Sequence, residues 1–235
     1  MKTCVVVPTY NEKENVEGLV QRLKSVGVSD LTLLFVDDNS PDGTQEAIRE
    51  VSKSEPWVFL LAREAKKGIG SAYVDGFRHA AATLDPDILV EMDADLQHPP
   101  SALPDLLKAI DGGADVAIAS RYMQGGGVVG WGRARRLISK GANAYSRFML
   151  GLPVMDCTSG FRAYTRACAV KVTTARLPAK GFEFQVATLF LLKQGAKMVE
   201  VPYVFSPRRA GKSKLGPGDM TRFLAGVAKL SLRGK

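Results

Sequence analysis

The segment Leu31-Thr-Leu-Leu-Phe-Val-Asp-Asp-Asn-Ser-Pro-Asp-Gly-Thr44 contains the pattern from which the fold can be inferred. Its first part, Leu31–Val36, is an almost uninterrupted apolar run, which is typical of a strand buried on both faces of a parallel sheet. Two aspartates end the run. Asp42-Gly-Thr44 then has the composition of a helix start, because an aspartate there can accept a backbone N–H from the first turn. The segment therefore predicts one strand–turn–helix unit.

The same unit recurs on both sides of this segment. Apolar runs predict strands at Thr3–Val7, Leu31–Val36, Val58–Leu61, Ile88–Met92 and Val116–Ala119. The segments between them have helical spacing, at about Glu12–Val26, Asp42–Ser54, Ser71–Thr83 and from Ser101 onward. This alternation predicts an α/β fold with an open, mostly parallel, Rossmann-like sheet flanked by helices. Ligands of such sheets bind at the carboxyl ends of the strands.

The pattern changes after residue 120. A glycine-rich loop at 125–132 precedes a basic amphipathic stretch, Arg133–Leu150, and a short apolar–polar segment near Thr158–Tyr164. A helix at Phe182–Gln194, a strand at Met198–Phe205, a loop at Ser206–Gly218 and an amphipathic stretch at Asp219–Arg233 are expected to follow. We find no internal repeat and no long linker, so residues 1–120 and 121–235 are expected to be two halves of one compact domain.

The charge of the chain is divided between these halves. With 46% hydrophobic and 24% charged residues, the composition excludes a disordered chain and a collagen-like fibre. Residues 1–120 hold 11 Lys and Arg against 20 Asp and Glu, a net charge of −9. Residues 121–235 hold 21 against 4, a net charge of +17. An acidic half beside a basic half indicates a partner that carries both a cation and an anion.

Acidic residues follow two of the expected strands. Asp37 and Asp38 end the second strand, while Asp93, Asp95 and Gln97 follow the fourth. Carboxylates on one loop suit a hard divalent cation such as Mg²⁺ or Mn²⁺, which takes its other ligands from phosphates and water. A nucleoside diphosphate would supply those phosphates. The alternative is a solvated turn with helix-capping aspartates.

Basic residues gather in the second half, where they indicate an anionic phosphate. One cluster is Arg133, Arg135, Arg136, Lys140 and Arg147, and the other is Arg208, Arg209, Lys212 and Lys214. Both clusters also have the composition of solvated surface. Nucleic acid is the weaker alternative, because the loops lack interleaved aromatic residues for base stacking.

Several features exclude other classes of protein. Gly68-Ile-Gly70 is an incomplete dinucleotide-binding motif, and it follows the third expected strand instead of the first, so a nicotinamide or flavin enzyme is not expected. These glycines instead indicate close backbone packing beside a ligand or a helix start. Three cysteines without paired spacing predict buried thiols in a reducing compartment. His79 is expected to be structural, whereas His98, beside the acidic loop, stays open. The chain has neither a signal peptide pattern nor a run of about 18 apolar residues for a membrane span.

Taken together, the motifs resemble those of family-2 glycosyltransferases with the GT-A fold, and most closely polyprenol-phosphate mannose synthases, over about residues 3–230. The motifs are Pro8-Thr-Tyr-Asn-Glu12, Val36-Asp-Asp-Asn-Ser-Pro-Asp-Gly-Thr44, Lys67-Gly-Ile-Gly70, Met92-Asp-Ala-Asp-Leu-Gln97, Ser120-Arg-Tyr122, the Arg135-to-Lys140 helix, Asp156-Cys-Thr-Ser-Gly-Phe-Arg162, Gly181-Phe-Glu-Phe-Gln185 and Arg208-Arg-Ala-Gly-Lys-Ser-Lys214. Asn39 stands where many relatives have Gly, and Gln97 where some have Ser.

The resemblance implies a role for each matching position. The residues that would bind the nucleotide and donor are Pro8, Tyr10, Glu12, Val36, Asp38, Gly70, Asp93, Ala94 and Lys214. Asp95 and Gln97 would bind Mg²⁺ or Mn²⁺, and Arg121, Arg135 and Ser139 would bind the acceptor phosphate. The residues closest to the chemistry would be Asp93, Asp95, Arg121 and Arg208.

The resemblance also implies the reaction and its setting. Mannose would pass from GDP-mannose, with inversion, to a dolichyl or polyprenyl phosphate. The chain would be peripheral on the cytoplasmic face of a membrane, with Arg133–Leu150 and the C-terminal stretch as interfacial surfaces, or as ordinary core helices instead. A small transmembrane subunit would anchor it in some relatives, and nucleic acid is not expected as a partner. The alternatives are a UDP-glucose-dependent polyprenyl-phosphate glucosyltransferase and a non-catalytic, membrane-associated nucleotide-sugar-binding subunit.

Overall fold

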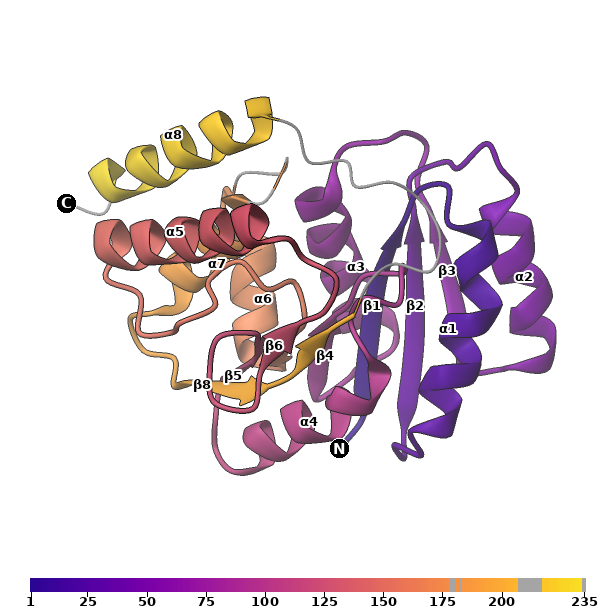
Figure 1. Cartoon of the computed structure of the whole chain (residues 1–235). Coiled ribbons are helices and arrows are strands. Elements are labelled where there is room, and N and C mark those ends of the chain that lie inside the picture. Colours follow the sequence, from indigo (N-terminus) through magenta and orange to yellow (C-terminus); the bar gives the residue numbers. More distant parts are fainter. Residues whose placement is uncertain (178–180, 182, 207–216, 234–235) are drawn as a thin grey trace.

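A computed structural model of the chain describes residues 1–177, 181, 183–206 and 217–233 (Figure 1). The strands are β1 (Thr3–Thr9), β2 (Leu31–Asp37), β3 (Val58–Ala62), β4 (Ile88–Glu91), β5 (Val116–Ser120), β6 (Gly127–Val128), β7 (Arg162–Thr165), β8 (Met198–Pro202) and β9 (Val204–Phe205). The helices are α1 (Lys13–Ser25), α2 (Thr44–Ser54), α3 (Ile69–Thr83), α4 (Leu103–Asp111), α5 (Arg133–Leu150), α6 (Arg166–Thr174), α7 (Glu183–Leu192) and α8 (Pro217–Arg233), with a 3-10 turn, η1, at Pro100–Ala102. The five strands and four helices expected in the first half are confirmed, with ends shifted by one or two residues.

Seven strands form one sheet in the order β3-β2-β1-β4-β7-β5-β8. All neighbouring pairs are parallel except those of β7, which runs antiparallel to both β4 and β5. Strand β7 comes from the second half of the chain but lies between two strands of the first half, so one sheet joins the two halves. The carboxyl ends of β1, β2 and β4 meet at one edge, where the sequence places the acidic loops.

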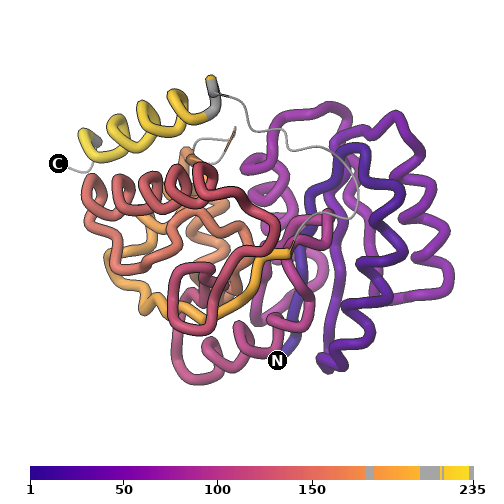
Figure 2. Tube along the Cα trace, in the orientation of Figure 1, coloured from indigo at the N-terminus to yellow at the C-terminus, as the bar shows by residue number. Residues whose placement is uncertain are grey.

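Helices cover both faces of the sheet, as the uninterrupted apolar runs predict. Alternate residues of one strand point to opposite faces, and the two sets belong to two separate buried clusters. Val5 and Val7 of β1 lie in the cluster with α1, α2 and α4, whereas Val6 lies in the cluster with α3, α5, α6, α7 and α8. On the second side α5 and α8 form an additional outer layer and lie beside each other (Figures 1 and 2).

Helix α3 crosses β1 and β2 at Gly76, where there is no room for a side chain. A Cβ atom there would lie 2.5 Å from Val6 Cγ1 and 2.9 Å from Val36 Cγ2. We therefore expect Gly76→Ala to lower the free energy of unfolding by about 1–3 kcal/mol, although alanine is the better helix former by about 1 kcal/mol. Urea denaturation measures the change. Gly141→Ala in α5 is the matched control, because a Cβ there meets no described atom within 4 Å. An unchanged Gly76→Ala protein would refute the close contact.

The second half departs from the sequence-based expectation in four places. Helix α6 was not expected, the segment near Thr158–Tyr164 contributes to β7, and part of the glycine-rich loop becomes β6, which pairs with β9. The single strand expected at Met198–Phe205 is divided into β8 and β9, which belong to different sheets. The glycine-rich loop folds back onto the end of β5 at Gly126, where a Cβ atom would lie 2.4 Å from the Ser120 carbonyl oxygen. The three cysteines are free and buried, as expected. No helix in the described part of the chain is long and apolar enough to cross a membrane.

Candidate functional site

The turn after β2 is held in place by Asp37. Its buried carboxylate accepts hydrogen bonds from Thr9 Oγ1 (2.9 Å), Ser40 Oγ (2.6 Å) and Gln45 Nε2 (2.8 Å). Asn39 in this turn has φ of +58°, a left-handed conformation that asparagine and glycine tolerate best. The bonds of Asp37 therefore assign it to the architecture of the turn rather than to a cation.

The neighbouring Asp38 fixes the loop that follows β3. Its carboxylate forms a buried ion pair with Arg63 (2.6 Å), and it accepts backbone N–H groups of Lys67 and Gly68. Burial raises the pKa of Asp38 above its ordinary value, although Arg63 and these N–H groups oppose the rise. The loop holds Lys66 Nζ 3.6 Å from the centroid of the Tyr10 ring. A cation thus lies against the aromatic face that was expected to contact the nucleotide.

The structure brings the expected nucleotide residues to neighbouring strands. Pro8 of β1 is the register partner of Val36 of β2, and Tyr10 and Asp38 each follow two residues later. Glu12 lies just before α1, where its carboxylate accepts Asn15 Nδ2 at 2.7 Å. Val36 points its side chain into the core against α3, so a nucleotide would meet it only through its backbone.

The loop after β4 places the acidic motif at the same edge of the sheet. Asp93 Oδ1 accepts the Tyr73 hydroxyl at 3.2 Å, and Asp95 Oδ1 accepts the backbone N–H of Gln97 at 3.1 Å. Leu96 between them has φ of +61°, which is strained for a bulky residue. Its side chain is buried against Gly18 of α1, and this packing maintains the strained turn. Backbone strain of this kind is typical of functional loops.

His98 holds the loop after β4 in place. Its Nδ1 accepts the backbone N–H of Asp93 at 3.1 Å, and its ring stacks on Phe161 with centroids 5.4 Å apart. Burial lowers the pKa of His98 to about 4, so the ring is neutral at physiological pH. The role that the sequence left open for His98 is therefore structural in this fold.

The loop provides oxygen donors that fit a hard divalent cation. Asp95 offers a carboxylate, and Gln97 donates its amide N–H to the Ser206 carbonyl (3.1 Å), which distinguishes the nitrogen end of that amide from its oxygen end. Among the described residues no group of three or more His, Cys, Asp or Glu side chains could enclose a metal. Mg²⁺ commonly uses one or two protein carboxylates plus phosphate and water, so the pair Asp95 and Gln97 fits it.

Arg121 is bound in a buried, two-pronged ion pair that the sequence did not reveal. Its Nε and Nη2 donate to the two carboxylate oxygens of Asp156 at 2.7 and 2.6 Å, and Nη2 also donates to Thr158 Oγ1. Burial would raise the pKa of Asp156, but the charge and hydrogen bonds of Arg121 outweigh it, so the pKa lies below its usual range. Asp156 is the first residue of the motif 156–162, but nothing in the sequence pairs it with Arg121.

Two aromatic rings connect Arg121 to helix α5. The Arg121 guanidinium carbon lies 5.5 Å from the ring centroids of both Tyr122 and Trp131. The Arg135 guanidinium carbon lies 4.1 Å from the Trp131 ring centroid. The Tyr122 hydroxyl donates to Ser139 Oγ at 2.6 Å. The three residues expected to bind the acceptor phosphate therefore form one cluster.

Phe205 places this cluster next to the acidic loop. Its ring centroid lies 5.7 Å from the Arg121 guanidinium carbon and 5.9 Å from the His98 ring centroid. A phosphate held at the arginines would thus lie close to a ligand held at the loop 93–97.

The structure gives Gly70 a packing role. It is in the first turn of α3, where a Cβ atom would lie 2.6 Å from Phe184 Cδ2, so helix packing explains this glycine. Arg208 and Lys214, with Arg209 and Lys212, lie outside the described residues.

The expected interfacial surface is only partly exposed. On α5, Leu137 (70% exposed), Ile138 and Phe148 (87%) face outward, whereas Leu150 is buried and Tyr145 packs against α8. On α8, Leu224 and Leu232 are exposed, while Phe223 and Val227 are buried. Because Arg133, Arg136, Lys140 and Arg147 share α5, the two helices present apolar and basic groups together.

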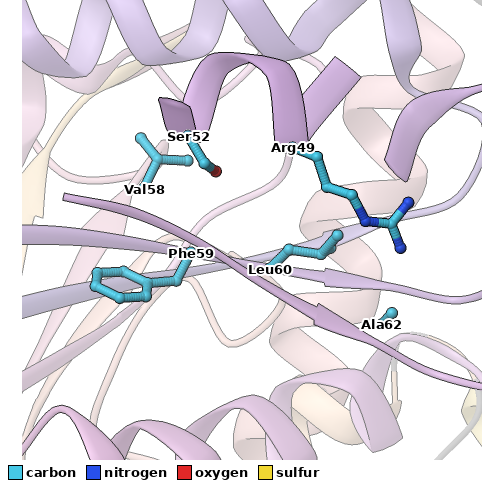
Figure 3. A pocket seen from close by; sticks show the side chains of 6 residues that line it. All are labelled: Arg49, Ser52, Val58, Phe59, Leu60 and Ala62. Atoms are coloured by element: carbon cyan, nitrogen blue, oxygen red, sulfur yellow. The ribbon is translucent and has the colours of Figure 1, made fainter. Parts of the chain in front are cut away.

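A separate hollow lies at the outer edge of the sheet, between α2 and β3. Figure 3 shows its lining, which is Arg49, Ser52, Val58, Phe59, Leu60 and Ala62. None of the residues expected at the site lines this hollow.

Comparison with known proteins identifies the family and the fold of the chain. Residues 4–172 match the family described as glycosyl transferase family 2. The chain is 40% identical to a polyprenol monophosphomannose synthase of Mycolicibacterium smegmatis, over 100% of this chain and 88% of the relative. It is 38% identical to an undecaprenyl-phosphate mannosyltransferase of Micrococcus luteus, over 100% and 96%. A mannosyltransferase of Pyrobaculum calidifontis, solved with GDP-mannose and Mn²⁺, shares the fold with a TM-score of 0.64 and 17% identity, over 97% of this chain and 69% of that one.

Proposed function

The chain belongs to glycosyl transferase family 2 and has the GT-A fold, and from this premise we propose that it transfers mannose from GDP-mannose to a polyprenyl monophosphate. One observation carries the proposal. Arg121, Arg135 and Ser139 form a cluster suited to a phosphate, next to a loop whose oxygen donors suit a metal–diphosphate. The full-length similarity to synthases of mannosyl lipids supports mannose and the lipid phosphate as the two substrates.

The donor would occupy the carboxyl edge of the sheet. In this proposal Pro8, Tyr10, Glu12 and Asp38, with the Val36 backbone, contact the nucleoside, while Asp93 and Ala94 contact the ribose or sugar. Asp95 and Gln97 would hold Mg²⁺ or Mn²⁺. When bound, the metal would stabilise the negative charge that develops on the departing diphosphate. Arg208 and Lys214 are assigned to the same diphosphate by the resemblance alone.

The acceptor needs no general base, because a phosphomonoester is already ionised at neutral pH. This fits a site whose nearby histidine is neutral and already bonded to the backbone of Asp93. One lipid phosphate oxygen forms the bond to the anomeric carbon while the bond from that carbon to the diphosphate oxygen breaks. The electron pair of that bond leaves with GDP. Attack on the face opposite the leaving group would convert an α donor into a β product.

Two anions must meet in this reaction, and fixed cations would offset their repulsion. The Arg121 charge is oriented by Asp156, and Arg135 is oriented by Trp131. Positively charged groups fixed before the substrates arrive are the most effective form of electrostatic catalysis. We assign Arg121, Arg135 and Ser139 to holding the acceptor phosphate in line with the anomeric carbon.

The surface of α5 and α8 would bring the chain to the lipid. Exposed apolar residues beside arginines and lysines are typical of helices that lie in a membrane interface. We propose a peripheral position on the cytoplasmic face, with a small membrane subunit as a further anchor.

Binding calorimetry in Mn²⁺ tests the donor. GDP-mannose should bind at least about tenfold more tightly than UDP-glucose, a difference of about 1.4 kcal/mol. Tighter binding of UDP-glucose would instead establish the alternative glucosyltransferase. If both sugar nucleotides bind but no transfer follows, the chain is the non-catalytic subunit.

A further inference from the structure

Two aromatic side chains to which the proposed mechanism assigns no role, Tyr122 and Trp131, lie between Arg121 and helix α5. Tyr122 and Trp131 are both half-buried, and each ring centroid lies 5.5 Å from the Arg121 guanidinium carbon. Each ring also contacts one residue of α5, Tyr122 through Ser139 and Trp131 through Arg135. The pair therefore joins a fixed, buried arginine to two separate points on one helix.

Trp131 contacts the long side chain of Arg135. Arg135 is exposed in the first turn of α5, and holding a long side chain in one geometry there costs rotamer entropy. Its guanidinium lies 4.1 Å from the Trp131 centroid, well within the range of cation–π attraction. Trp131 is itself held by the edge of Phe205, with centroids 5.4 Å apart. The indole of Trp131 therefore links the buried Phe205 ring to the exposed Arg135 guanidinium.

Tyr122 acts in the same way on Ser139. Its hydroxyl donates to Ser139 Oγ at 2.6 Å, which leaves the serine hydroxyl hydrogen available to a different acceptor. Arg135 and Ser139 are four residues apart and therefore share one face of α5. A phosphate at that face would receive hydrogen bonds from both.

We propose that Tyr122 and Trp131 are positioning residues that fix Arg135 and Ser139 relative to Arg121, so that the acceptor phosphate site is assembled before the lipid arrives. The inference rests on the proposed function, because it assigns these rings to the acceptor of that reaction. It predicts an effect on the acceptor and none on the donor.

The first test uses farnesyl phosphate, a short acceptor that needs no membrane. Trp131→Leu should raise the KM for farnesyl phosphate about tenfold with little change in the dissociation constant of GDP-mannose. Trp131→Phe, which keeps a ring, should recover most of the loss. Tyr122→Phe, which removes only the hydroxyl, should raise the same KM by about threefold or more. An unchanged KM in Trp131→Leu and Tyr122→Phe would overturn the proposal.

The second test measures the fluorescence of Trp131. The chain has two tryptophans, and Trp57 lies just before β3, bonded to Glu55. Trp57→Phe should retain activity and leave Trp131 as the single tryptophan, which can be excited selectively over the tyrosines. Titration with farnesyl phosphate should change its emission with a midpoint near the KM, whereas farnesol should not. Binding of farnesyl phosphate without that change contradicts the proposal. Absence of both binding and mannose transfer in the unmodified chain would instead contradict the proposed function.

Discussion

Asp95→Asn is expected to lower kcat/KM by about 10³-fold or more while the protein stays folded. Asparagine has the same shape, and its amide oxygen can still accept the Gln97 N–H that Asp95 accepts at 3.1 Å. The substitution therefore removes the negative charge without removing the hydrogen bond. If Asp95 holds the metal of the leaving diphosphate, this loss of charge abolishes most of the transition-state stabilisation.

Steady-state kinetics with saturating Mn²⁺ measure this effect, and circular dichroism checks the fold. Asp105→Asn is the matched control, because Asp105 is exposed in the first turn of α4 and contacts no part of the site. The control should have wild-type kinetics. If the kcat/KM of Asp95→Asn is within tenfold of the wild-type value, Asp95 does not hold the metal.

Breaking the Arg121–Asp156 pair is expected to have the largest effect on stability. Arg121→Met or Asp156→Leu should each cost about 3–5 kcal/mol, because each leaves the other charge buried without its partner. The double variant should cost less than the sum of the two, since no unpaired charge remains. Each variant should also lose most of its activity, as Arg121 is part of the acceptor cluster.

Urea denaturation of the four proteins gives the coupling between the two side chains. Glu50→Gln is the control, because Glu50 forms an exposed pair with Lys53 at 2.6 Å, and such pairs contribute little. The native pKa of Asp156 lies below its usual range, so the unfolded chain binds more protons as the pH falls. The stabilisation is therefore complete at neutral pH, begins to fall near pH 4, the approximate pKa of an unfolded aspartate, and is lost as the pH falls through the lower native pKa. If the free-energy costs of Arg121→Met and Asp156→Leu simply add in the double variant, the two side chains are not coupled.

The architecture could be predicted from local sequence because each central strand is buried on both faces. Leu31–Val36 and Val116–Ala119 are uninterrupted apolar runs, and helices with clear periodicity separate them. Strand β7 has no such signal. The strand is short, Arg162–Thr165, and two of its four residues, Arg162 and Thr165, are polar. Its place between β4 and β5 depends on contacts with residues distant in the sequence.

The site was predictable where it depends on strand ends, and less so where it depends on distant partners. Asp93, Asp95 and Gln97 lie on one loop, so their proximity follows from the sequence. Asp156, 35 residues from Arg121, becomes its partner only in the folded chain. The sequence left open whether α5 is an interfacial surface or a core helix, because it does not show that Tyr145 of α5 contacts α8.

Transfer of radiolabelled mannose from GDP-mannose to a polyprenyl phosphate is the decisive assay for the proposed activity. The chain, Mn²⁺ and detergent-solubilised lipid are incubated together, and label is measured in the organic phase with Asp95→Asn as the negative control. We expect metal-dependent label in a lipid that alkaline phosphatase cannot dephosphorylate, and none with UDP-glucose as the donor. Sugar nucleotide that binds to the chain but never yields labelled lipid would refute the proposed mannosyl transfer.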